Sequence, residues 1–300
     1  MEGIPAGKRI IVGCDLKFIA EEHLSDHIAH TIEQYKSKLQ SIDLAQFNKN
    51  IVDPVKMLFD RAVYGVDWKT LLANETFRQR DRSNTNEIGY FHQGVFAYLS
   101  NCKVPEVGKE GGWDVIYTPQ DGYALEDGSR VRRIYVEMKN KHNTMNSSSS
   151  ARTYIKMQTQ LLRDDSCACF LVEAIAKRSQ NIPWQTTVDG NRVHHARIRR
   201  VSIDQFYAII TGEEKAFYQL CSVLPSVIEK VVHCDGNKSK MPKDTVYEEL
   251  REAGNRLGLG DKDQVFVMAL YMLGFGSYWG FRERGMGQNS SSASGPRKNS

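Results

Sequence analysis

Two acidic residues and a lysine carry the first chemistry that the sequence suggests. Asp114 lies in a β-type run, and Glu137 and Lys139 lie two positions apart at the end of a second one. Side chains two positions apart on a strand point to the same face, so Glu137 and Lys139 would share a face. Two carboxylates on neighbouring strands can share a hard cation such as Mg²⁺, and an ammonium beside them can position water or stabilise negative charge. This donor set suits the in-line hydrolysis of a phosphodiester.

The spacing acid-x-Lys is common, so its context decides its meaning. The chain also contains Asp15-Leu16-Lys17, Asp67-Trp68-Lys69 and Glu213-Glu214-Lys215, all in segments whose pattern indicates helix or loop. Of these spacings, the one at Glu137 alone ends a β-branched run and follows an Asp-bearing strand, although an edge strand with its charges in water is an alternative interpretation. Glu87, in the helical segment before the strands, is a candidate third carboxylate or else a solvated helical glutamate.

Basic and small polar residues surround this motif. Residues 130–156 contain seven basic residues and one acid, Glu137. Small polar groups that lead into a helix N-terminus suit phosphate contacts, although a flexible linker has a similar composition. We predict DNA contacts from Lys141, His142, Asn143, Asn146, Arg152 and Lys156.

A second basic cluster covers residues 192–200, where four arginines and two histidines stand within nine positions. On one strand, His195, Arg197 and Arg199 would share a face, and arginine matches both guanine edges and phosphate oxygens. The two adjacent histidines would point apart, which argues against a metal pair. The alternative is a solvated edge strand protected by its charges. We predict DNA contacts from Arg192, His195, Arg197 and Arg199.

The elements that must position these residues follow from hydrophobic periodicity. Helical spacing covers residues 16–39, 68–78 and 83–99, and Asp53-Pro54 begins a further helix. The apolar face of that further helix would consist of Val55, Leu58, Phe59 and Ala62. The β-type runs cover residues 113–117, 131–139, 168–174 and 192–201. The first two runs would form a hairpin with a long connection, and a polar loop (143–150) and a helix (152–162) follow them. Further helices start at Ser202 and continue to about residue 275.

This order of elements predicts an α/β (α+β) fold with a small mixed central sheet flanked by helices. We expect a single domain over residues 1–286, with a helical lead (1–100), a sheet core (101–201) and a helical C-terminal part (202–286). Residues 287–300 are rich in Gly, Ser and Asn, and we expect them to be disordered.

Composition limits the class of protein. Of the 300 residues, 41% are hydrophobic and 25% are charged, as in a folded globular chain. The net charge of +4 excludes binding to nucleic acid by bulk charge, so positive charge toward DNA must be local. No transmembrane helix or signal peptide is predicted. The six cysteines fit no zinc spacing and indicate reduced thiols in a cytoplasmic protein.

The order Asp114, then Glu137-Met138-Lys139 at the end of a strand, resembles the PD-(D/E)xK nuclease superfamily. More specific stretches resemble a group of bacterial type II restriction endonucleases that cut the palindrome GGNCC. These stretches are Asp53-Pro54-Val55-Lys56, Arg78-Gln79, residues 83–93 (SNTNEIGYFHQ), Gly112-Trp113-Asp114-Val115 and residues 136–141 (VEMKNK). The resemblance covers roughly residues 8–275 and is longest over residues 83–93. Trp113 stands where the superfamily has the proline of its name, which is often absent.

The resemblance implies a Mg²⁺-dependent endonuclease that acts as a homodimer on double-stranded DNA and leaves 5′-phosphate and 3′-hydroxyl ends. Asp114 and Glu137 would hold the metal, and Lys139 would serve the attacking water. Glu87 is carried over as a further catalytic residue, and Gln93 is carried over without an assigned role. A cognate DNA methyltransferase would belong to the same system, with no physical complex and no membrane implied.

Two other functions stay open at the level of sequence. A structure-specific DNA repair or junction nuclease would share the fold but would cut branched or damaged DNA instead of a defined duplex sequence. A non-catalytic DNA-binding module would bind without cutting. The intact set of Asp114, Glu137 and Lys139 argues against such a module, because a decayed site would usually have lost one of them.

Overall fold

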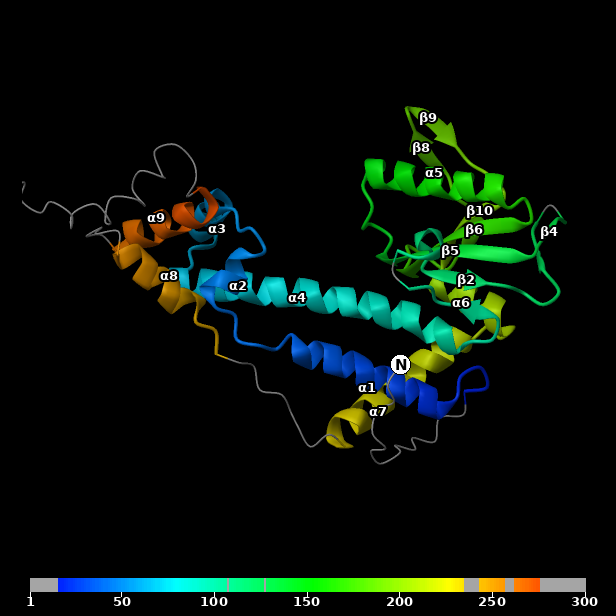
Figure 1. Ribbon diagram of the computed structural model, residues 1–300, viewed down its shortest axis with the longest axis horizontal. Coiled ribbons are helices and arrows are strands. Elements are labelled where there is room, and N and C mark those ends of the chain that lie inside the picture. The colour runs from blue at the N-terminus through cyan, green and yellow to red at the C-terminus, as the bar shows by residue number, and fades with distance from the viewer. Residues whose placement is uncertain (1–15, 107, 127, 235–242, 257–261, 276–300) are drawn as a thin grey trace, which may run out of the picture. The chain divides into compact units, whose positions relative to one another are not determined.

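The computed structural model describes residues 16–106, 108–126, 128–234, 243–256 and 262–275 (Figure 1). The chain divides into two compact units, of which the first takes residues 1–35 and 85–238 and the second takes residues 36–84 and 239–300. The single domain expected over residues 1–286 stays a prediction, and the tail at 287–300 lies outside the described residues. None of the described helices is long and apolar enough to cross a membrane.

A six-stranded mixed sheet forms the centre of the first unit. Its strands lie in the order β1 (Cys102–Lys103), β2 (Val115–Tyr117), β5 (Arg133–Lys141), β6 (Cys167–Ile175), β10 (Ile198–Ser202) and β7 (Asn181–Pro183). β5, β6 and β10 are parallel, whereas β1, β2 and β7 add to them in antiparallel pairs. β6 is buried over residues 167–173, as expected for a strand that is covered on both faces. The predicted hairpin of β2 and β5 and the predicted mixed sheet are both confirmed.

Helix α5 (Ser147–Arg163) covers one face of the sheet. Its buried residues Tyr154, Met157 and Leu161 follow helical spacing and join Leu171 of β6 in one cluster. This packing fixes α5 against β5 and β6, and so determines which of its polar side chains reach the sheet.

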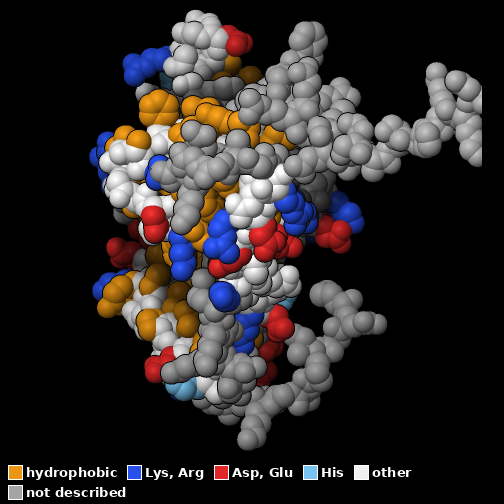
Figure 2. All heavy atoms as spheres, turned by 90° about the vertical axis from the view of Figure 1, so that its left-hand side faces the viewer, with side chains coloured by type: hydrophobic (Ala, Val, Ile, Leu, Met, Phe, Trp, Pro, Cys, Tyr) orange, Lys and Arg blue, Asp and Glu red, His pale blue; other side chains and the backbone are white. Residues whose placement is uncertain are grey.

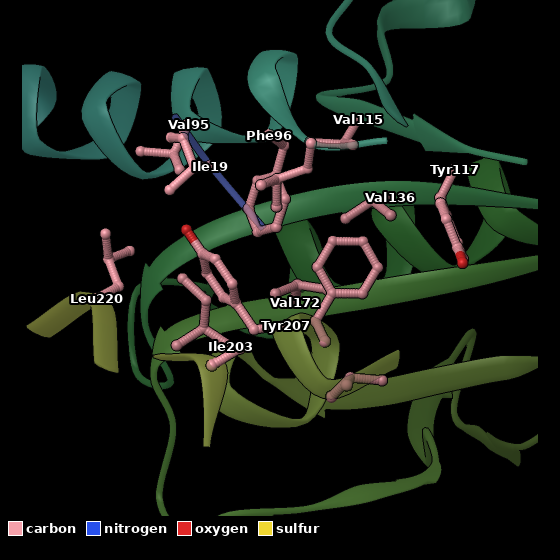
Figure 3. Packing of buried hydrophobic residues seen from close by; sticks show 14 of the residues in the cluster. Ile19, Val95, Phe96, Val115, Tyr117, Val136, Val172, Ile203, Tyr207 and Leu220 are labelled. Carbon is pink, nitrogen blue, oxygen red and sulfur yellow. The ribbon is translucent and has the colours of Figure 1, made fainter. Parts of the chain in front are cut away.

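The other face of the sheet carries a larger cluster of buried residues (Figure 3). The helices that contribute to it are α1 (Glu21–Ser37), α6 (Ile203–Thr211), α7 (Ala216–Cys234) and the C-terminal end of α4 (Trp68–Val95). In Figure 3, Phe96 and Tyr207 lie together beside Val136 and Val172 of the sheet. The sheet is therefore held between two apolar layers, as the predicted fold class requires.

Helix α4 is one continuous helix of 28 residues, so the prediction of two helices over residues 68–78 and 83–99 is wrong. Residues 83–86 resemble a helix start, because Ser and Asn favour N-caps. The segment holds no proline or glycine to interrupt the backbone hydrogen bonds, so the helix continues through it. A 3₁₀ turn, η1 (Phe96–Tyr98), follows.

The second unit is helical. It contains α2 (Leu44–Asn48), α3 (Pro54–Tyr64), α8 (Val246–Asn255), α9 (Lys262–Phe275) and the first part of α4. Its core includes Trp68, Leu250 and Phe266. Asp53 caps α3 as predicted, since its Oδ1 accepts hydrogen bonds from the backbone N–H groups of Val55 and Lys56.

The predicted apolar face of α3 is confirmed at Leu58, which packs against the core of the second unit, and is wrong at its other three positions. Val55 and Phe59 are 41% and 68% exposed and Ala62 is exposed, whereas Met57 is only 3% exposed. Periodicity finds apolar stripes on a helix, but the neighbouring elements decide which stripe meets the core. Hydrophobic side chains also stand at the surface, among charged ones, on the face drawn in Figure 2.

Two segments near the predicted site also differ from expectation. The loop predicted over residues 143–150 is half helical, because α5 begins at Ser147 with Asn146 as its N-cap. The strand predicted over residues 192–201 is two strands, β9 (Asn191–Val193) and β10. The reason is a tight Asp189-Gly190 turn, with φ of 48° and 80°, which pairs β9 with β8 (Thr186–Val188) in its own hairpin.

The long connection between β2 and β5 contains a second small hairpin, formed by β3 (Tyr123–Ala124) and β4 (Arg130–Val131). A short 3₁₀ turn, η2 (Glu110–Gly112), precedes β2. Because Asp114 lies between this turn and β2, separated from the turn by Trp113 alone, the turn and β2 together set the position of the aspartate.

Candidate active site

The pairing of β2 with β5 brings Asp114 and Glu137 to the same place. In the antiparallel register Val115 is opposite Val136, so Asp114 is opposite Glu137 in the next pair. The backbone N–H of Asp114 donates to the carbonyl of Val136 at 2.9 Å. Its carboxylate Oδ2 accepts a hydrogen bond from the backbone N–H of Met138 at 2.6 Å. Backbone groups of β5 therefore hold the aspartate beside the glutamate.

Lys139 lies on the same face of β5 as Glu137, as predicted. Its Nζ is 2.7 Å from Glu137 Oε1, and the two side chains are 28% and 16% exposed. The ammonium therefore lies beside the Glu137 carboxylate and is not directed into bulk water. The strand alternation that suggested the motif is the direct cause of this contact.

A second lysine, Lys156 of α5, meets the same carboxylate. Its Nζ donates to Glu137 Oε2 at 2.8 Å and to the carbonyl of Gly112 at 2.7 Å. It also lies 4.2 Å from the centroid of the Trp113 ring, a cation–π contact. We predicted Lys156 as a DNA contact and not as a member of this site. The signal that could have found it is its place next to Met157 on the buried side of a helix that follows the motif.

Burial and charge act differently on the two carboxyl groups. Burial, together with the nearby charge of Glu137, raises the pKa of Asp114 above its ordinary value. Burial also raises the pKa of Glu137, but the ammonium groups of Lys139 and Lys156 outweigh it and hold this pKa below its ordinary value. A cation bound between the Asp114 and Glu137 carboxylates would be stabilised, because it relieves the repulsion between their negative charges.

The end of α4 supports both strands of this site. Gln93 Nε2 donates to the carbonyl of Asp114 at 3.1 Å, and Asn140 Nδ2 donates to the carbonyl of Thr85 at 2.9 Å. Gly89 lies against Asn140, since a Cβ there would be 3.3 Å from each amide heteroatom. The stretch 83–93, where the sequence resemblance is longest, therefore contacts the backbone of Asp114 and the side chain of Asn140.

Glu87 is buried, with 9% of its surface exposed, so its interpretation as a solvated helical glutamate is wrong. Among the described residues, no group of three or more His, Cys, Asp or Glu side chains is placed to hold a metal. Glu87 thus does not complete a three-ligand set with Asp114 and Glu137. Its part in catalysis stays a prediction.

Most of the predicted DNA contacts near the motif are exposed. These are Lys141, His142, Asn143, Asn146 and Arg152. Asn146 is engaged as the cap of α5, where its Oδ1 accepts from Ser149 N at 2.8 Å. The loop after β5 is also fixed by Arg200, which donates to the carbonyl of His142 at 3.0 Å and pairs with the fully buried Glu173. The exposed groups are therefore presented by an anchored loop.

The second basic cluster does not share one face, so that expectation is wrong. Arg192 is exposed on β9, while His195 and Arg197 lie in the connection to β10. Arg197 donates to the carbonyl of Asp165. Arg199 is only 3% exposed, because it pairs with Glu126 at 2.6 Å and donates to Asn181. The guanidinium of Arg199 is thus engaged inside the protein.

A model of the family described as Eco47II restriction endonuclease matches residues 16–233. The chain belongs to the Eco47II restriction endonuclease family. It is 31% identical over 222 residues to the type II restriction enzyme Sau96I of Staphylococcus aureus, covering 71% of this chain and 80% of that protein. It is 25% identical over 229 residues to the type II restriction enzyme Eco47II of Escherichia coli, covering 72% of this chain and 88% of that protein.

The range matched by the Eco47II family contains every residue of the predicted site, from Glu87 to Arg199. Family membership confirms the predicted sequence-specific type II restriction endonuclease, a nuclease that acts on double-stranded DNA. It favours this function over the repair nuclease and the DNA-binding module that the sequence left open. The observed mixed sheet flanked by helices agrees with the fold expected from the resemblance.

Proposed function

We propose that this restriction endonuclease cuts GGNCC in double-stranded DNA, depends on Mg²⁺ and acts as a homodimer. The observation that carries the proposal is the pairing of Asp114 with Glu137 beside the Lys139 ammonium. The sequence motifs resemble those of the group that recognises GGNCC, which supplies the expected site. A palindromic site has two-fold symmetry, so two copies of the chain would each cut one strand.

The two carboxylates fit a magnesium ion. Magnesium prefers oxygen ligands and commonly uses one or two carboxylates, with water and substrate phosphate completing its coordination. Asp114 and Glu137 supply such a pair, and the absence of a third carboxylate or imidazole ligand among the described residues agrees with this pattern. Asp114 Oδ2 accepts a hydrogen bond from Met138 N, and its Oδ1 accepts none from the described residues. Zinc sites in proteins, by contrast, are most often built around Cys or His ligands.

In the proposed reaction, Asp114 and Glu137 would hold the metal, and Lys139 would orient the attacking water and stabilise the charge on the phosphate. The bound metal would neutralise negative charge as the phosphorus is attacked. Water adds to phosphorus, the bond from phosphorus to the 3′ oxygen breaks, and that oxygen takes up a proton. The products are a 5′-phosphate and a 3′-hydroxyl. The low pKa of Glu137 keeps this carboxylate ionised for its role at neutral pH.

The exposed basic and polar residues would bind the DNA backbone. The loop after β5 and the start of α5 offer Lys141, His142, Asn143, Asn146 and Arg152 close to the site in sequence. Arg192 on β9 is exposed and has no polar partner among the described residues, so it remains available to a base or phosphate. We also propose DNA contacts from His195 and Arg197, which lie in the connection between β9 and β10. Arg199 would act on the fold through its internal ion pair and not on DNA.

The biological setting is also proposed. A cognate DNA methyltransferase would belong to the same restriction–modification system without forming a complex with this chain. An endonuclease that cuts DNA inside the cell would act in the bacterial cytoplasm. This location agrees with the free cysteines Cys102, Cys167, Cys169 and Cys221.

Digestion of two plasmids tests the proposed activity. One plasmid carries GGNCC sites and the other has none, and each is incubated with the protein and Mg²⁺ or with EDTA. We expect discrete fragments from the first plasmid with Mg²⁺ alone, and the sequenced fragment ends give the site and the stagger. The variant Asp114→Asn should not cut, whereas Asp121→Asn, which changes an exposed aspartate away from the site, should cut normally.

Other results of this experiment would contradict the proposal in different ways. A smear from both plasmids would indicate a non-specific nuclease. Intact plasmid with a retarded gel band would indicate binding alone, and cleavage of branched DNA only would indicate a junction nuclease. Equal cleavage in EDTA would refute the metal requirement. Sedimentation with and without a GGNCC duplex would test the homodimer.

A further inference from the structure

We propose that Lys156 is a positioning residue. Its ammonium holds Glu137 before the metal binds, then releases Glu137 Oε2 to the metal and turns to the scissile phosphate. The inference rests on the proposed function. It is carried by three contacts of one ammonium group: Glu137 Oε2 at 2.8 Å, the carbonyl of Gly112 at 2.7 Å and the ring of Trp113 at 4.2 Å. The acid-x-Lys motif contains no counterpart of this lysine, which comes from α5.

The local fold is built to present Lys156 at this place. Tyr154 and Met157, on either side of it in sequence, are fully buried, so the helix cannot turn the lysine away from the sheet. Gly112 has a φ of +69°, in the left-handed region that favours glycine, and its carbonyl accepts the ammonium. Trp113, only 4% exposed, offers the face of its ring to the same group. A flexible lysine is thereby held in one conformation.

The charges of the site explain why Lys156 would release Glu137 when the metal binds. Asp114 and Glu137 carry two negative charges, and Lys139 and Lys156 carry two positive ones, so the four groups are balanced. Each oxygen of Glu137 is already paired with a different lysine. A divalent cation that binds Glu137 therefore requires an oxygen that a lysine now occupies, and it repels both ammonium groups.

Lys156 is better suited than Lys139 to release the carboxylate. After leaving Glu137 Oε2, it keeps the Gly112 carbonyl and the Trp113 ring as partners, so its charge stays in the site. No partner other than Glu137 is found for the Lys139 ammonium among the described residues. The released ammonium, still beside the carboxylates, is then ready for the negative charge of the phosphate.

This role predicts opposite effects on metal binding and on cleavage. In the full-length Lys156→Met variant, Mn²⁺ should bind about 3- to 30-fold more tightly without DNA, because a competing positive charge has been removed. Cleavage at saturating metal should fall about 10²- to 10³-fold, because a prearranged cationic group is missing. Methionine keeps much of the unbranched stem and its contact with Trp113. Lys156→Arg keeps the charge and should retain weak metal binding.

The measurements are Mn²⁺ binding followed by electron paramagnetic resonance, single-turnover cleavage of a GGNCC duplex, and tryptophan fluorescence during the metal titration. Emission should change on metal binding in the wild type, and this change should be lost in Trp113→Phe. Lys215→Met removes an exposed lysine outside the site and should match the wild type throughout. The thermal unfolding midpoint of each variant identifies any loss of fold, and Lys156→Arg supplies the comparison if Lys156→Met does not fold.

The outcomes separate this inference from the proposed function. If the wild type neither binds Mn²⁺ nor cuts DNA, the proposed function fails. If the wild type cuts but Lys156→Met binds Mn²⁺ no more tightly, the lysine does not compete with the metal and the inference is overturned. Weaker metal binding together with slower cleavage would indicate a merely structural residue. Unchanged metal affinity with weaker DNA binding would indicate a simple phosphate contact.

Discussion

Replacing Lys139 by alanine tests the assignment of the central lysine. Its ammonium is 2.7 Å from Glu137 Oε1, and such a charge-assisted hydrogen bond contributes about 1.5–3 kcal/mol when well shielded. Because the lysine side chain is 28% exposed and Glu137 keeps Lys156, we expect a loss of only about 1 kcal/mol in the free energy of unfolding. The loss in the transition state should be larger, about 2.7–4 kcal/mol, or roughly 10²- to 10³-fold in rate.

The assay for Lys139→Ala combines three measurements on the same preparation. Single-turnover cleavage of a GGNCC duplex gives the rate, a gel shift in EDTA gives DNA affinity, and urea unfolding gives stability. Lys215→Ala, which removes an exposed lysine elsewhere, serves as the control for charge alone. The reasoning is refuted if Lys139→Ala cuts at the wild-type rate, or if its lower rate is explained entirely by weaker DNA binding.

Further predictions concern stability and DNA affinity. Gly94→Ala should lower the free energy of unfolding by about 1–3 kcal/mol in urea titration, because the new Cβ would lie 2.4 Å from the ring of His27; unchanged stability would mean that the ring moves freely. Burial lowers the pKa of His27 from 6.5, so the unfolded chain binds a proton more readily and stability present above pH 6.5 is lost as the pH falls below it. His27→Gln should reduce this pH dependence in unfolding titrations. Arg199→Ala should lower the melting temperature, since the buried guanidinium pairs with Glu126, whereas Arg192→Ala should leave it unchanged and weaken DNA binding in a gel shift; the opposite pattern would reverse their assignments.

The core of the site was predictable because it depends on local rules. Alternation along a strand places Glu137 and Lys139 on one face, and a hairpin places the preceding strand, with Asp114, beside it. The mixed sheet was predictable for a related reason. Its buried strands read as apolar runs of strand length, and the helices between them read as amphipathic segments.

The errors have two origins. In α4 and α3 the surrounding structure outweighs a local signal, and between β9 and β10 a local turn signal is missed. Residues 83–86 resemble a cap, but no proline or glycine separates them from the preceding helical residues, and α4 continues through them. The apolar stripe of α3 at Val55 and Phe59 is real, yet the core of the second unit meets Met57 instead. The turn at Asp189-Gly190 is a local hairpin signal whose omission merged β9 and β10 into one strand.

The sequence by itself determined the nuclease motif, the class of fold and the family resemblance, because these depend on residue type and on spacing along one or two neighbouring elements. It did not determine the use of each cation, because a lysine or arginine has the same signature whether it faces solvent, a carboxylate or DNA. Tertiary packing decided that Lys156 meets Glu137, through the seating of α5 on the sheet. Tertiary packing also decided that Arg199 is buried against Glu126 while Arg192 remains exposed. These assignments depend on which elements pack together across long separations in the chain, and no periodicity within one segment encodes them.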